Sequence, residues 1–221
     1  MNNHTVTTII DQEKCNGCGL CELVCPNRTI SMINNKAVVT GDRSQNCGHC
    51  AAVCPVDAIQ VSAIDDSAFS FETFRVGDRW LPPGQFDTQE LIRLMRSRRS
   101  CRNFSDRPVD RRVLQDLVKT GISAPSGTNS QKWTFSILPT RQALMELGEQ
   151  IGQFFHRLNR MAEKPWLRRL LKVIGKPQLE NYYKEYYDSV REGLEEWEQS
   201  GRDLLFHGAA AGILVGSRPG A

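Results

Sequence analysis

Seven of the eight cysteines in this 221-residue chain fall in two runs with the spacing of metal ligands. The first run contains Cys15, Cys18, Cys21 and Cys25. Three of these cysteines recur 29 positions later as Cys47, Cys50 and Cys54. Thiolates are the ligands that iron–sulfur clusters use, and gaps of two residues let consecutive sulfur atoms converge on one cube. The chain is therefore predicted to bind iron and inorganic sulfide rather than to form disulfides.

The cysteine spacing resembles that of bacterial-type two-cluster ferredoxins. In such proteins three thiolates of one run hold one cluster, and the fourth thiolate crosses to the other cluster. The resemblance implies that a first [4Fe–4S] cluster is bound by Cys15, Cys18, Cys21 and Cys54. The alternative is a structural zinc site, which needs only four cysteines and usually takes them from two Cys-x2-Cys pairs.

The second ligand set is incomplete, because Ser44 stands where a fourth cysteine belongs. The remaining thiols are Cys25, Cys47 and Cys50. Three outcomes are open: a [3Fe–4S] cluster, a four-iron cluster with serine or solvent oxygen on one iron, or no second cluster. A serine alkoxide is a harder and more basic donor than a thiolate, so we expect a second cluster that is weaker and more labile. His49 is expected beside this cluster rather than on it.

A second group of chemically competent residues lies at the end of a predicted helix. It contains Arg98, Arg99, Ser100 and Arg102. Guanidinium groups and a hydroxyl that converge in one turn suit a phosphate or the polar edge of a flavin. The alternative is a solvated basic helix face. A nucleic-acid partner is disfavoured, because Phe104 is the only aromatic residue among these arginines and single-strand binders stack bases on several.

A polar loop at residues 123–131 precedes the next predicted strand. It contains Pro125, Ser126 and Asn129. Small side chains and exposed backbone N–H groups allow a flat ring to approach such a loop closely. Taken alone, the pattern indicates no more than a polar loop.

Together, the two segments resemble the FMN-dependent nitroreductase family. The resemblance rests on Arg-Arg-Ser-x-Arg-x-Phe, followed about 20 residues later by Ala-Pro-Ser-Gly-x-Asn-x-Gln-x-Trp. The cysteine half resembles the ferredoxin module that precedes this domain in some members. The resemblance implies that one subunit of a homodimer binds FMN through Arg98, Arg99, Ser100 and Arg102. The other subunit would approach the flavin with Pro125, Ser126 and Asn129, and no catalytic residue is indicated.

The sequence departs from the family pattern in two places. Lys132 occupies a position that is usually proline, and the sequence stops at Ala221, before the last strands that the family domain normally has. A sheet without those strands would expose apolar edge and core surface. Either the flavin site is degraded or the sequence is a fragment of a longer protein, and we expect a fragment.

The expected fold class is α+β. A ferredoxin-like domain at residues 1–63 is predicted to contain short strands and helices, and so small a unit depends on its metal for folding. The strands are expected at Thr7–Ile10, Thr29–Met32, Ala37–Val39 and Ile59–Ser62, and the helices at Leu20–Val24 and Cys50–Val53. A connector is expected at residues 64–86, where Trp80 and three phenylalanines suggest packing, and a nitroreductase-like domain at residues 87–221.

In that last domain, two acidic residues are expected to cap helices. Asp87, in a capping box with Glu90, precedes one helix, and Asp110 precedes another. Buried strands are expected at Trp133–Leu138 and Gly212–Gly216, with a long helical region between them.

Composition excludes several classes of function. The 28 basic and 25 acidic residues leave a net charge of +3, which is too small to indicate a nucleic-acid partner. The start of the sequence lacks the pattern of a signal peptide, and no apolar run is long enough for a membrane span. We expect a cytoplasmic protein.

The leading hypothesis is an iron–sulfur flavoprotein that reduces a small electrophile of the nitroaromatic, quinone or enone type. The electron donor is expected to be reduced ferredoxin or NAD(P)H, although no Gly-x-Gly-x-x-Gly turn argues for a separate nicotinamide site. The alternative from another class is a ferredoxin-type electron carrier without bound flavin. A zinc-stabilised interaction module is a third possibility.

Overall fold

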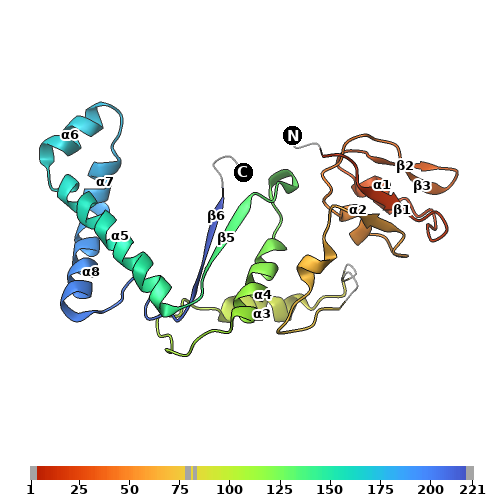
Figure 1. Cartoon of the computed structure of the whole chain (residues 1–221). Helices are drawn as coiled ribbons and strands as arrows, with labels where there is room; N and C mark the ends of the chain where they lie inside the picture. The colour runs from red at the N-terminus through yellow and green to blue at the C-terminus, as the bar shows by residue number, and fades with distance from the viewer. Residues whose placement is uncertain (1–3, 78–80, 82–83, 218–221) are drawn as a thin grey trace. The chain divides into compact units, whose positions relative to one another are not determined.

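The computed structural model describes residues 4–77, 81 and 84–217, so Trp80 and the C-terminal residues from Arg218 lie outside the described part. Figure 1 shows the helices and strands of the chain, which divides into two compact units. One unit comprises Met1–Arg98, Gln115–Phe135 and Val215–Ala221. The other comprises Arg99–Leu114 and Ser136–Leu214. Helices and small sheets occur together, which confirms the α+β class.

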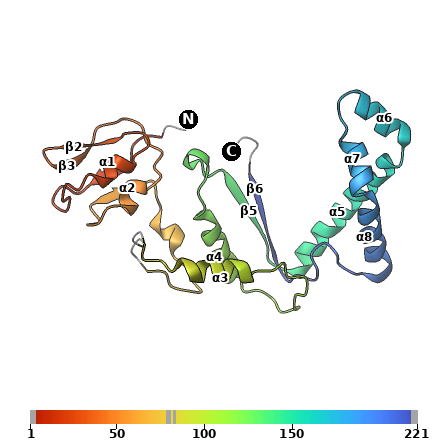
Figure 2. The same cartoon turned by 180° about the vertical axis from the view of Figure 1, so that it is seen from behind.

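The cysteine-rich segment folds into two antiparallel strand pairs and two short helices (Figure 2). Strand β1 (Thr8–Ile10) pairs with β4 (Ile59–Val61), and β2 (Ile30–Ile33) pairs with β3 (Lys36–Val39). The helices are α1 (Leu20–Val24) and α2 (His49–Ala52). The strands and helices predicted for this segment are thus confirmed, with boundaries that differ by one residue at most.

The 29-residue repeat is visible in the backbone as well as in the cysteines. Gly19 and Gly48 occupy the N-cap positions of α1 and α2 with φ values of 75° and 73°, a left-handed conformation that favours glycine. A side chain at Gly48 would also collide with Ile64, because an added Cβ would lie 2.4 Å from the Ile64 Cδ1 atom. The repeat therefore fixes two equivalent turns, each of which presents cysteines at the start of a short helix.

The core of this segment is small and includes cysteine side chains. Its buried members are Cys15, Cys21, Ile30, Ala37 and Ala58. So little buried hydrocarbon provides limited stability for a unit of this size. Ligation of a metal cluster would supply what the apolar core does not.

The next segment leads from the 3-10 helix η1 (Asp66–Phe69) to α3 (Thr88–Ser97) and α4 (Arg111–Ile122). Asp87 caps α3 as predicted, because its carboxylate accepts hydrogen bonds from the N–H groups of Gln89 and Glu90. The Glu90 carboxylate, the second member of the predicted capping box, pairs with Arg93 at 2.5 Å. Asp110 caps α4 through the N–H of Arg112, also as predicted.

The strands β5 (Trp133–Leu138) and β6 (Gly212–Ser217) form a two-stranded sheet. The positions of both strands were predicted correctly, but the prediction that they are buried was wrong. Alternate residues of β5 are exposed, and in β6 Leu214 and Val215 are 45% and 68% exposed. Two strands cannot cover one another on both faces, so apolar surface remains open.

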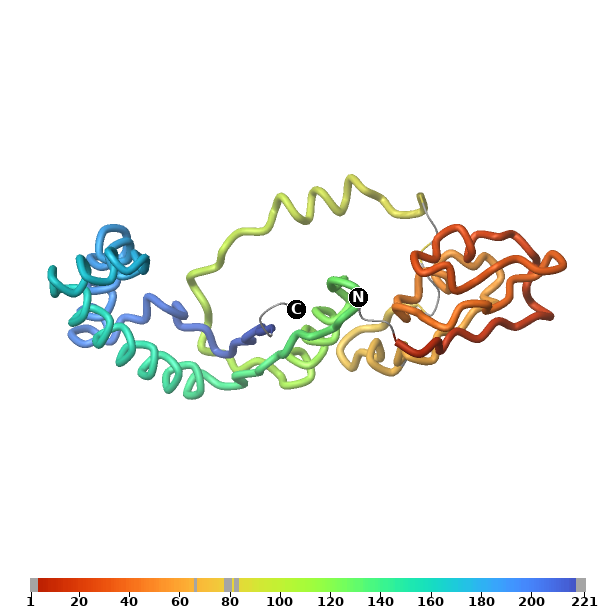
Figure 3. The backbone as a smooth tube through the Cα atoms, turned by 90° about the horizontal axis from the view of Figure 1, so that it is seen from above, coloured from red at the N-terminus to blue at the C-terminus, as the bar shows by residue number. Residues whose placement is uncertain are grey.

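The other helices belong mainly to the second compact unit and follow one another along the chain (Figure 3). They are α5 (Arg141–Ala162), α6 (Pro165–Val173), α7 (Gln178–Glu185) and α8 (Tyr187–Ser200). Helix α5 packs along α8, where Gly148 lets the Trp197 ring approach closely. Leu144 of α5 is almost fully buried, and its side chain lies against Gly212 of β6.

Candidate functional site

The four cysteines assigned to the first cluster line one pocket. These are Cys15, Cys18, Cys21 and Cys54. The first three come from the turn before α1 and from α1 itself, whereas Cys54 comes from the turn after α2. The structure therefore brings the first cysteine run close to Cys54 of the second run, as the resemblance to ferredoxins implies. Their role as ligands remains a prediction.

Backbone N–H groups surround the sulfur atoms of this first pocket. The N–H of Ala37 donates to the Cys15 Sγ at 3.5 Å, and the N–H of Ala58 donates to the Cys54 Sγ at 3.2 Å. The Lys36 ammonium donates to the backbone carbonyl groups of Gln12 and Cys15 at 2.9 and 2.5 Å. Donors and positive charge around the sulfur atoms favour the thiolate form that binds iron.

The pKa values of two of these thiols move in opposite directions. Hydrogen bonds from the N–H groups of Ala37 and Gly17 lower the pKa of Cys15. Burial raises the pKa of Cys21. The charge of bound iron would deprotonate both thiols, because a coordinating thiol loses its proton to the metal's field.

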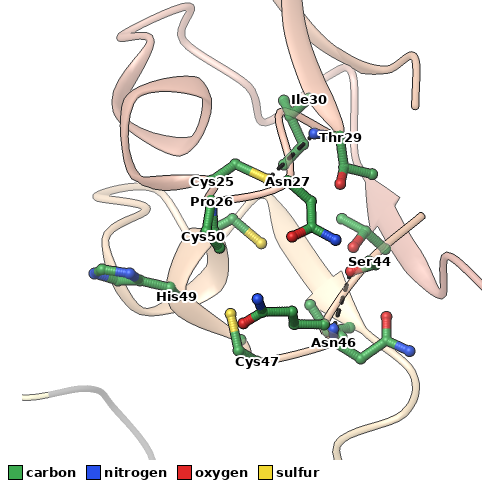
Figure 4. A pocket seen from close by; sticks show the side chains of 14 residues that line it. Cys25, Pro26, Asn27, Thr29, Ile30, Ser44, Asn46, Cys47, His49 and Cys50 are labelled. Atoms are coloured by element: carbon green, nitrogen blue, oxygen red, sulfur yellow. Dashed lines mark hydrogen bonds between the residues drawn. The ribbon is translucent and has the colours of Figure 1, made fainter. Parts of the chain in front are cut away.

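The second pocket collects the remaining three cysteines, Cys25, Cys47 and Cys50, together with Ser44 (Figure 4). Cys25 follows α1, whereas Cys47 and Cys50 flank the start of α2. The N–H of Thr29 donates to the Cys25 Sγ at 3.3 Å, in the same way that Ala58 donates to Cys54 in the first pocket. The two pockets are thus built by the same local geometry.

Ser44 occupies the place in the second pocket that Cys15 has in the first. Its hydroxyl oxygen accepts a hydrogen bond from the N–H of Asn46 at 3.0 Å, and the Cys15 sulfur is bonded by the N–H of Gly17 in the equivalent turn. Ser44 is 9% exposed, and its backbone pairs with His4 through two hydrogen bonds of 3.0 and 3.1 Å. The serine oxygen is therefore held at the rim of the cysteine pocket (Figure 4).

Burial affects the thiols of the second pocket differently. Burial, with a smaller contribution from the nearby Cys47 and Cys25, raises the pKa of Cys50 to about 11. Burial acts in the same sense on Cys25, but hydrogen bonds from Thr29, Asn27 and Ile30 together outweigh it and lower the pKa of Cys25. The His49 ring points away from the Cys47 and Cys50 sulfur atoms (Figure 4).

The donor set of both pockets fits an iron–sulfur cluster. All eight cysteines are free thiols, and seven of them line the two pockets. Within the described ranges, no three His, Cys, Asp or Glu side chains stand in the arrangement of a single-ion site. A cube that carries iron at alternate corners holds its thiolates farther apart than one ion does, and the thiols here line the walls of a cavity.

The arginine-serine segment follows α3 without regular secondary structure. Arg98 is the C-cap of that helix, and Arg99, Ser100 and Arg102 are exposed in the stretch that precedes α4. Cys101 is also exposed, and its thiol donates to the Asn103 carbonyl at 3.4 Å. The segment therefore presents exposed guanidinium groups, whose planar forks match the geometry of an anionic group such as a phosphate.

The loop with Pro125, Ser126 and Asn129 has an unusual backbone. Thr128, Asn129 and Gln131 all have left-handed φ values, between 50° and 53°. Such values are rare for residues other than glycine, and least favourable for a β-branched residue such as Thr128. The Ser126 hydroxyl stabilises the loop by accepting a hydrogen bond from the N–H of Gln131 at 2.9 Å. Pro125 is exposed.

The side chain of Asn129 makes a contact that its position in the family motif does not suggest. Its amide group donates to the backbone carbonyl groups of Gln45 and Asn46, at 2.9 and 3.1 Å. These two residues lie between Ser44 and Cys47 in the second cysteine loop. All of them belong to the same compact unit. Sequence reasoning missed this contact, because residues 83 or 84 positions apart carry no local signal of proximity.

Asp116 of α4 was also missed. It is 2% exposed and accepts hydrogen bonds from the N–H groups of Glu72 and Thr73. An aspartate in an amphipathic helix is normally expected on the solvent-exposed face. The one sequence feature that could have indicated burial is the position of Asp116 between Leu114 and Leu117. This carboxylate connects the segment after the cysteine-rich region to α4.

Comparison with known proteins finds two family models that match different parts of the chain. The model of the nitroreductase family matches residues 95–219, and the model of the 4Fe-4S binding domain matches residues 8–31. Together with the two cysteine pockets, these matches define a chain in which a ferredoxin-type iron–sulfur domain precedes a nitroreductase domain. The chain belongs to the nitroreductase family, whose model covers more than half of its length.

The curated relatives that match include iodotyrosine deiodinases. The protein from Daphnia pulex is 36% identical over 66 residues, which cover 30% of this chain and 21% of the relative. The rat iodotyrosine deiodinase 1 is 30% identical over 105 residues, or 47% of this chain and 35% of the relative. The protein from Haliscomenobacter hydrossis is 25% identical over 150 residues, or 59% of this chain and 66% of the relative.

The chain therefore spans 66% or less of the length of each of these three relatives. No solved structure matches the chain. Among the described residues, no helix has both the length and the apolar character needed to cross a membrane.

Proposed function

We propose that this protein passes electrons from two iron–sulfur clusters to FMN and from FMN to a small electrophile. The observation that carries the proposal is the pair of cysteine pockets within a chain of the nitroreductase family. Iron–sulfur clusters exchange single electrons, whereas a flavin collects two electrons and can pass them on together. A chain with both parts could connect a one-electron donor to a two-electron reduction.

The residues of the chain have distinct tasks in this proposal. Cys15, Cys18, Cys21 and Cys54 hold a [4Fe–4S] cluster, and backbone N–H groups orient their sulfur atoms. Cys25, Cys47 and Cys50 hold the second cluster, with Ser44 or solvent oxygen at its fourth corner or with a [3Fe–4S] composition. A three-thiolate site retains iron less firmly than a four-thiolate site, which accounts for the expected lability.

The FMN would be bound by the two segments of the family motif. The guanidinium groups of Arg98, Arg99 and Arg102 supply charge-assisted donors for the phosphate, and the Ser100 hydroxyl adds a neutral donor. The loop with Pro125 and Ser126 would pack against the flavin ring, because its side chains are small enough for a flat ring to approach closely.

We further propose that the protein works as a homodimer, with a flavin at each interface. Helix α3 supports this proposal, because it exposes a set of apolar side chains: Leu91, Ile92, Leu94 and Met95. Leu94 and Met95 are 70% and 62% exposed, more than isolated surface positions require. Reduced ferredoxin or NAD(P)H would be the donor.

The acceptor is proposed to be a nitroaromatic, a quinone or an enone. The names of the relatives favour a second candidate, a halogenated phenol such as an iodotyrosine. In that reaction two electrons and one proton replace the carbon–halogen bond by a carbon–hydrogen bond and release halide. Turnover of each acceptor class with the same reduced enzyme distinguishes these substrates.

The test of the proposed function begins with cofactor content. The chain is purified under anaerobic conditions, iron and acid-labile sulfide are counted, and flavin is released with acid. The proposal predicts iron, sulfide and FMN in one protein. Iron and sulfide without releasable FMN would favour a ferredoxin-type electron carrier, and zinc without sulfide would favour a structural module.

A further inference from the structure

The two cysteine pockets are related position by position, beyond the cysteines themselves. Each residue that lines the first pocket has a counterpart, 29 positions away, that lines the second pocket. Cys15 corresponds to Ser44, and Cys54 corresponds to Cys25. Because the same backbone geometry surrounds both pockets, a difference between them can be traced to the side chains at equivalent positions.

The counterparts differ in polarity in one direction. Ala37, Val56 and Ala58 line the first pocket, whereas their counterparts in the second pocket are Thr8, Asn27 and Thr29. The second pocket thus has polar side chains where the first has apolar ones. The Thr29 hydroxyl is committed to the carbonyl of Arg43 at 2.6 Å. The Asn27 amide points towards Ser44 inside the pocket (Figure 4).

This difference has a direct redox consequence. Hydrogen-bond donors and polar surroundings stabilise the more negative, reduced form of a cluster and raise its reduction potential. Coordination by three thiolates in place of four removes one negative charge and acts in the same direction. Both effects predict a higher reduction potential for a cluster in the second pocket than for one in the first.

The second pocket is also the one that contacts the candidate flavin loop. Asn129 donates to the carbonyl groups of Gln45 and Asn46, immediately before Cys47. The Asn46 side chain is anchored on its other side, because its amide donates to the Thr5 carbonyl at 3.1 Å and accepts from the Thr7 hydroxyl at 3.2 Å. The loop is therefore fastened to a rigid part of the cluster turn.

We propose that the second pocket holds the cluster of higher reduction potential, and that electrons leave the iron–sulfur domain through it, across the Asn129 contact. The inference rests on the proposed function. With the cofactors bound, each electron that the first cluster loses would reduce the second cluster, which would then pass it to the flavin and be re-oxidised. Two such electrons and two protons from solvent would reduce one flavin, and the external one-electron donor would re-reduce the first cluster. Asn129 is a positioning residue in this scheme.

Reciprocal exchange of one lining residue tests the order of the potentials. Redox titration followed by EPR should give two potentials, and Ser44→Cys identifies the signal of the second cluster by altering it. Asn27→Val should lower the reduction potential of the second cluster and leave that of the first cluster unchanged. Val56→Asn should raise the reduction potential of the first cluster. An Asn27→Val variant that leaves the second cluster's potential unchanged, or a wild-type chain with one cluster only, would overturn the proposal.

Amide hydrogen exchange tests the contact of Asn129 without any need for bound flavin. Asn129→Asp places a negative charge against two carbonyl oxygens, and loss of two side-chain hydrogen bonds should raise exchange in segments 44–48 and 125–131 roughly tenfold. Thr128→Ala is the matched control, since the Thr128 hydroxyl donates to the carbonyl of its own neighbour, Gly127. Unchanged exchange in segment 44–48 would refute the contact.

A kinetic measurement separates this inference from the proposed function. In wild-type protein with reduced clusters, flavin reduction should follow at a rate that Asn129→Asp lowers and Thr128→Ala does not. Equal rates in all three proteins would contradict the role of Asn129 while the proposed function stands. A protein that never binds flavin would contradict the proposed function, and the exchange experiment would still decide whether Asn129 holds the loop.

Discussion

The Asp116 carboxylate of α4 accepts two hydrogen bonds from Thr73, one from its N–H at 2.7 Å and one from its hydroxyl at 2.6 Å. The N–H of Glu72 adds a third donor at 3.0 Å, and Asp116 is almost fully buried beneath them. A buried carboxylate needs such donors to remain ionised. The segment that follows the cysteine-rich region is therefore fixed to α4 by one side chain.

Replacing Asp116 with alanine should release this segment. The N–H groups of Glu72 and Thr73 would lose a charged acceptor, and amide exchange at residues 70–77 should rise by roughly tenfold or more. Limited proteolysis should cut the same stretch faster. Asp188→Asn in α8 is the control, since the Asp188 side chain is 80% exposed. Exchange that stays at the wild-type level would show that other contacts hold the segment.

The helical unit should lose stability in acid through Asp203. Burial alone would raise the pKa of Asp203, but the N–H groups of Phe206 and Gly208 and the Arg141 guanidinium at 2.6 Å lower it. A carboxyl whose pKa is lower in the folded state contributes stability above its unfolded pKa of about 3.9, and this contribution is lost as the pH falls through the folded value.

Asp203→Asn should therefore lower the stability of α5–α8 at neutral pH and flatten its dependence on pH below about pH 4. Urea unfolding at several pH values, followed by the circular dichroism of the helices, measures both effects. If the variant shows the acid dependence of the wild type, other carboxyls must carry the linkage.

Ser44→Cys should complete the second ligand set. The Ser44 oxygen is already held by the N–H of Asn46, just as the Cys15 sulfur is held by the N–H of Gly17, so a thiolate would enter the equivalent position. We expect more iron per chain and slower loss of the second cluster in air. Iron content and EPR spectra identical to the wild type would show that residue 44 does not limit the site.

Cys54→Ser should remove the first cluster but not the second. Cys54 is the one thiol of the first pocket that comes from the second cysteine run, so its loss tests the crossed arrangement. We expect the iron and sulfide of one cluster to disappear, while the signal that Ser44→Cys alters remains. Cys101→Ser is the control, because this exposed thiol lies outside both pockets. Loss of the second cluster's signal instead would assign Cys54 to the other site.

Arg99→Ala should weaken FMN binding. One charge-assisted hydrogen bond contributes about 1.5–3 kcal/mol, so its removal should raise the dissociation constant by roughly 10- to 150-fold. Arg157→Ala, an exposed arginine of α5, should leave binding unchanged. Equal FMN affinity in the two variants, measured by fluorescence titration, would remove Arg99 from the proposed site.

The cysteine-rich half was largely predictable because its signals are local. Fixed spacings, the glycines at 19 and 48 and the 29-residue register determine the turns, and the crossed ligand set followed from the ferredoxin resemblance. Asn129 and Asp116 were not predictable in this way. Each bonds to backbone groups more than 40 positions away, and backbone acceptors or donors leave no trace in the sequence.

The exposure of β5 and β6 was misjudged for a related reason. An apolar strand such as Trp133–Leu138 predicts that its side chains are buried, but the sequence of the strand does not identify the elements that pack on it. Burial requires neighbouring strands or helices, and β5 and β6 pair only with each other within the described sheets.

The most direct test follows reduction of the flavin by the clusters within one protein. The anaerobic chain is mixed with a one-electron donor, and cluster and flavin absorbance are recorded together at several protein concentrations. The account predicts that the clusters are reduced first and that the flavin then bleaches at a rate independent of protein concentration. A rate that rises in proportion to concentration, or clusters that stay reduced beside oxidised flavin, would contradict it.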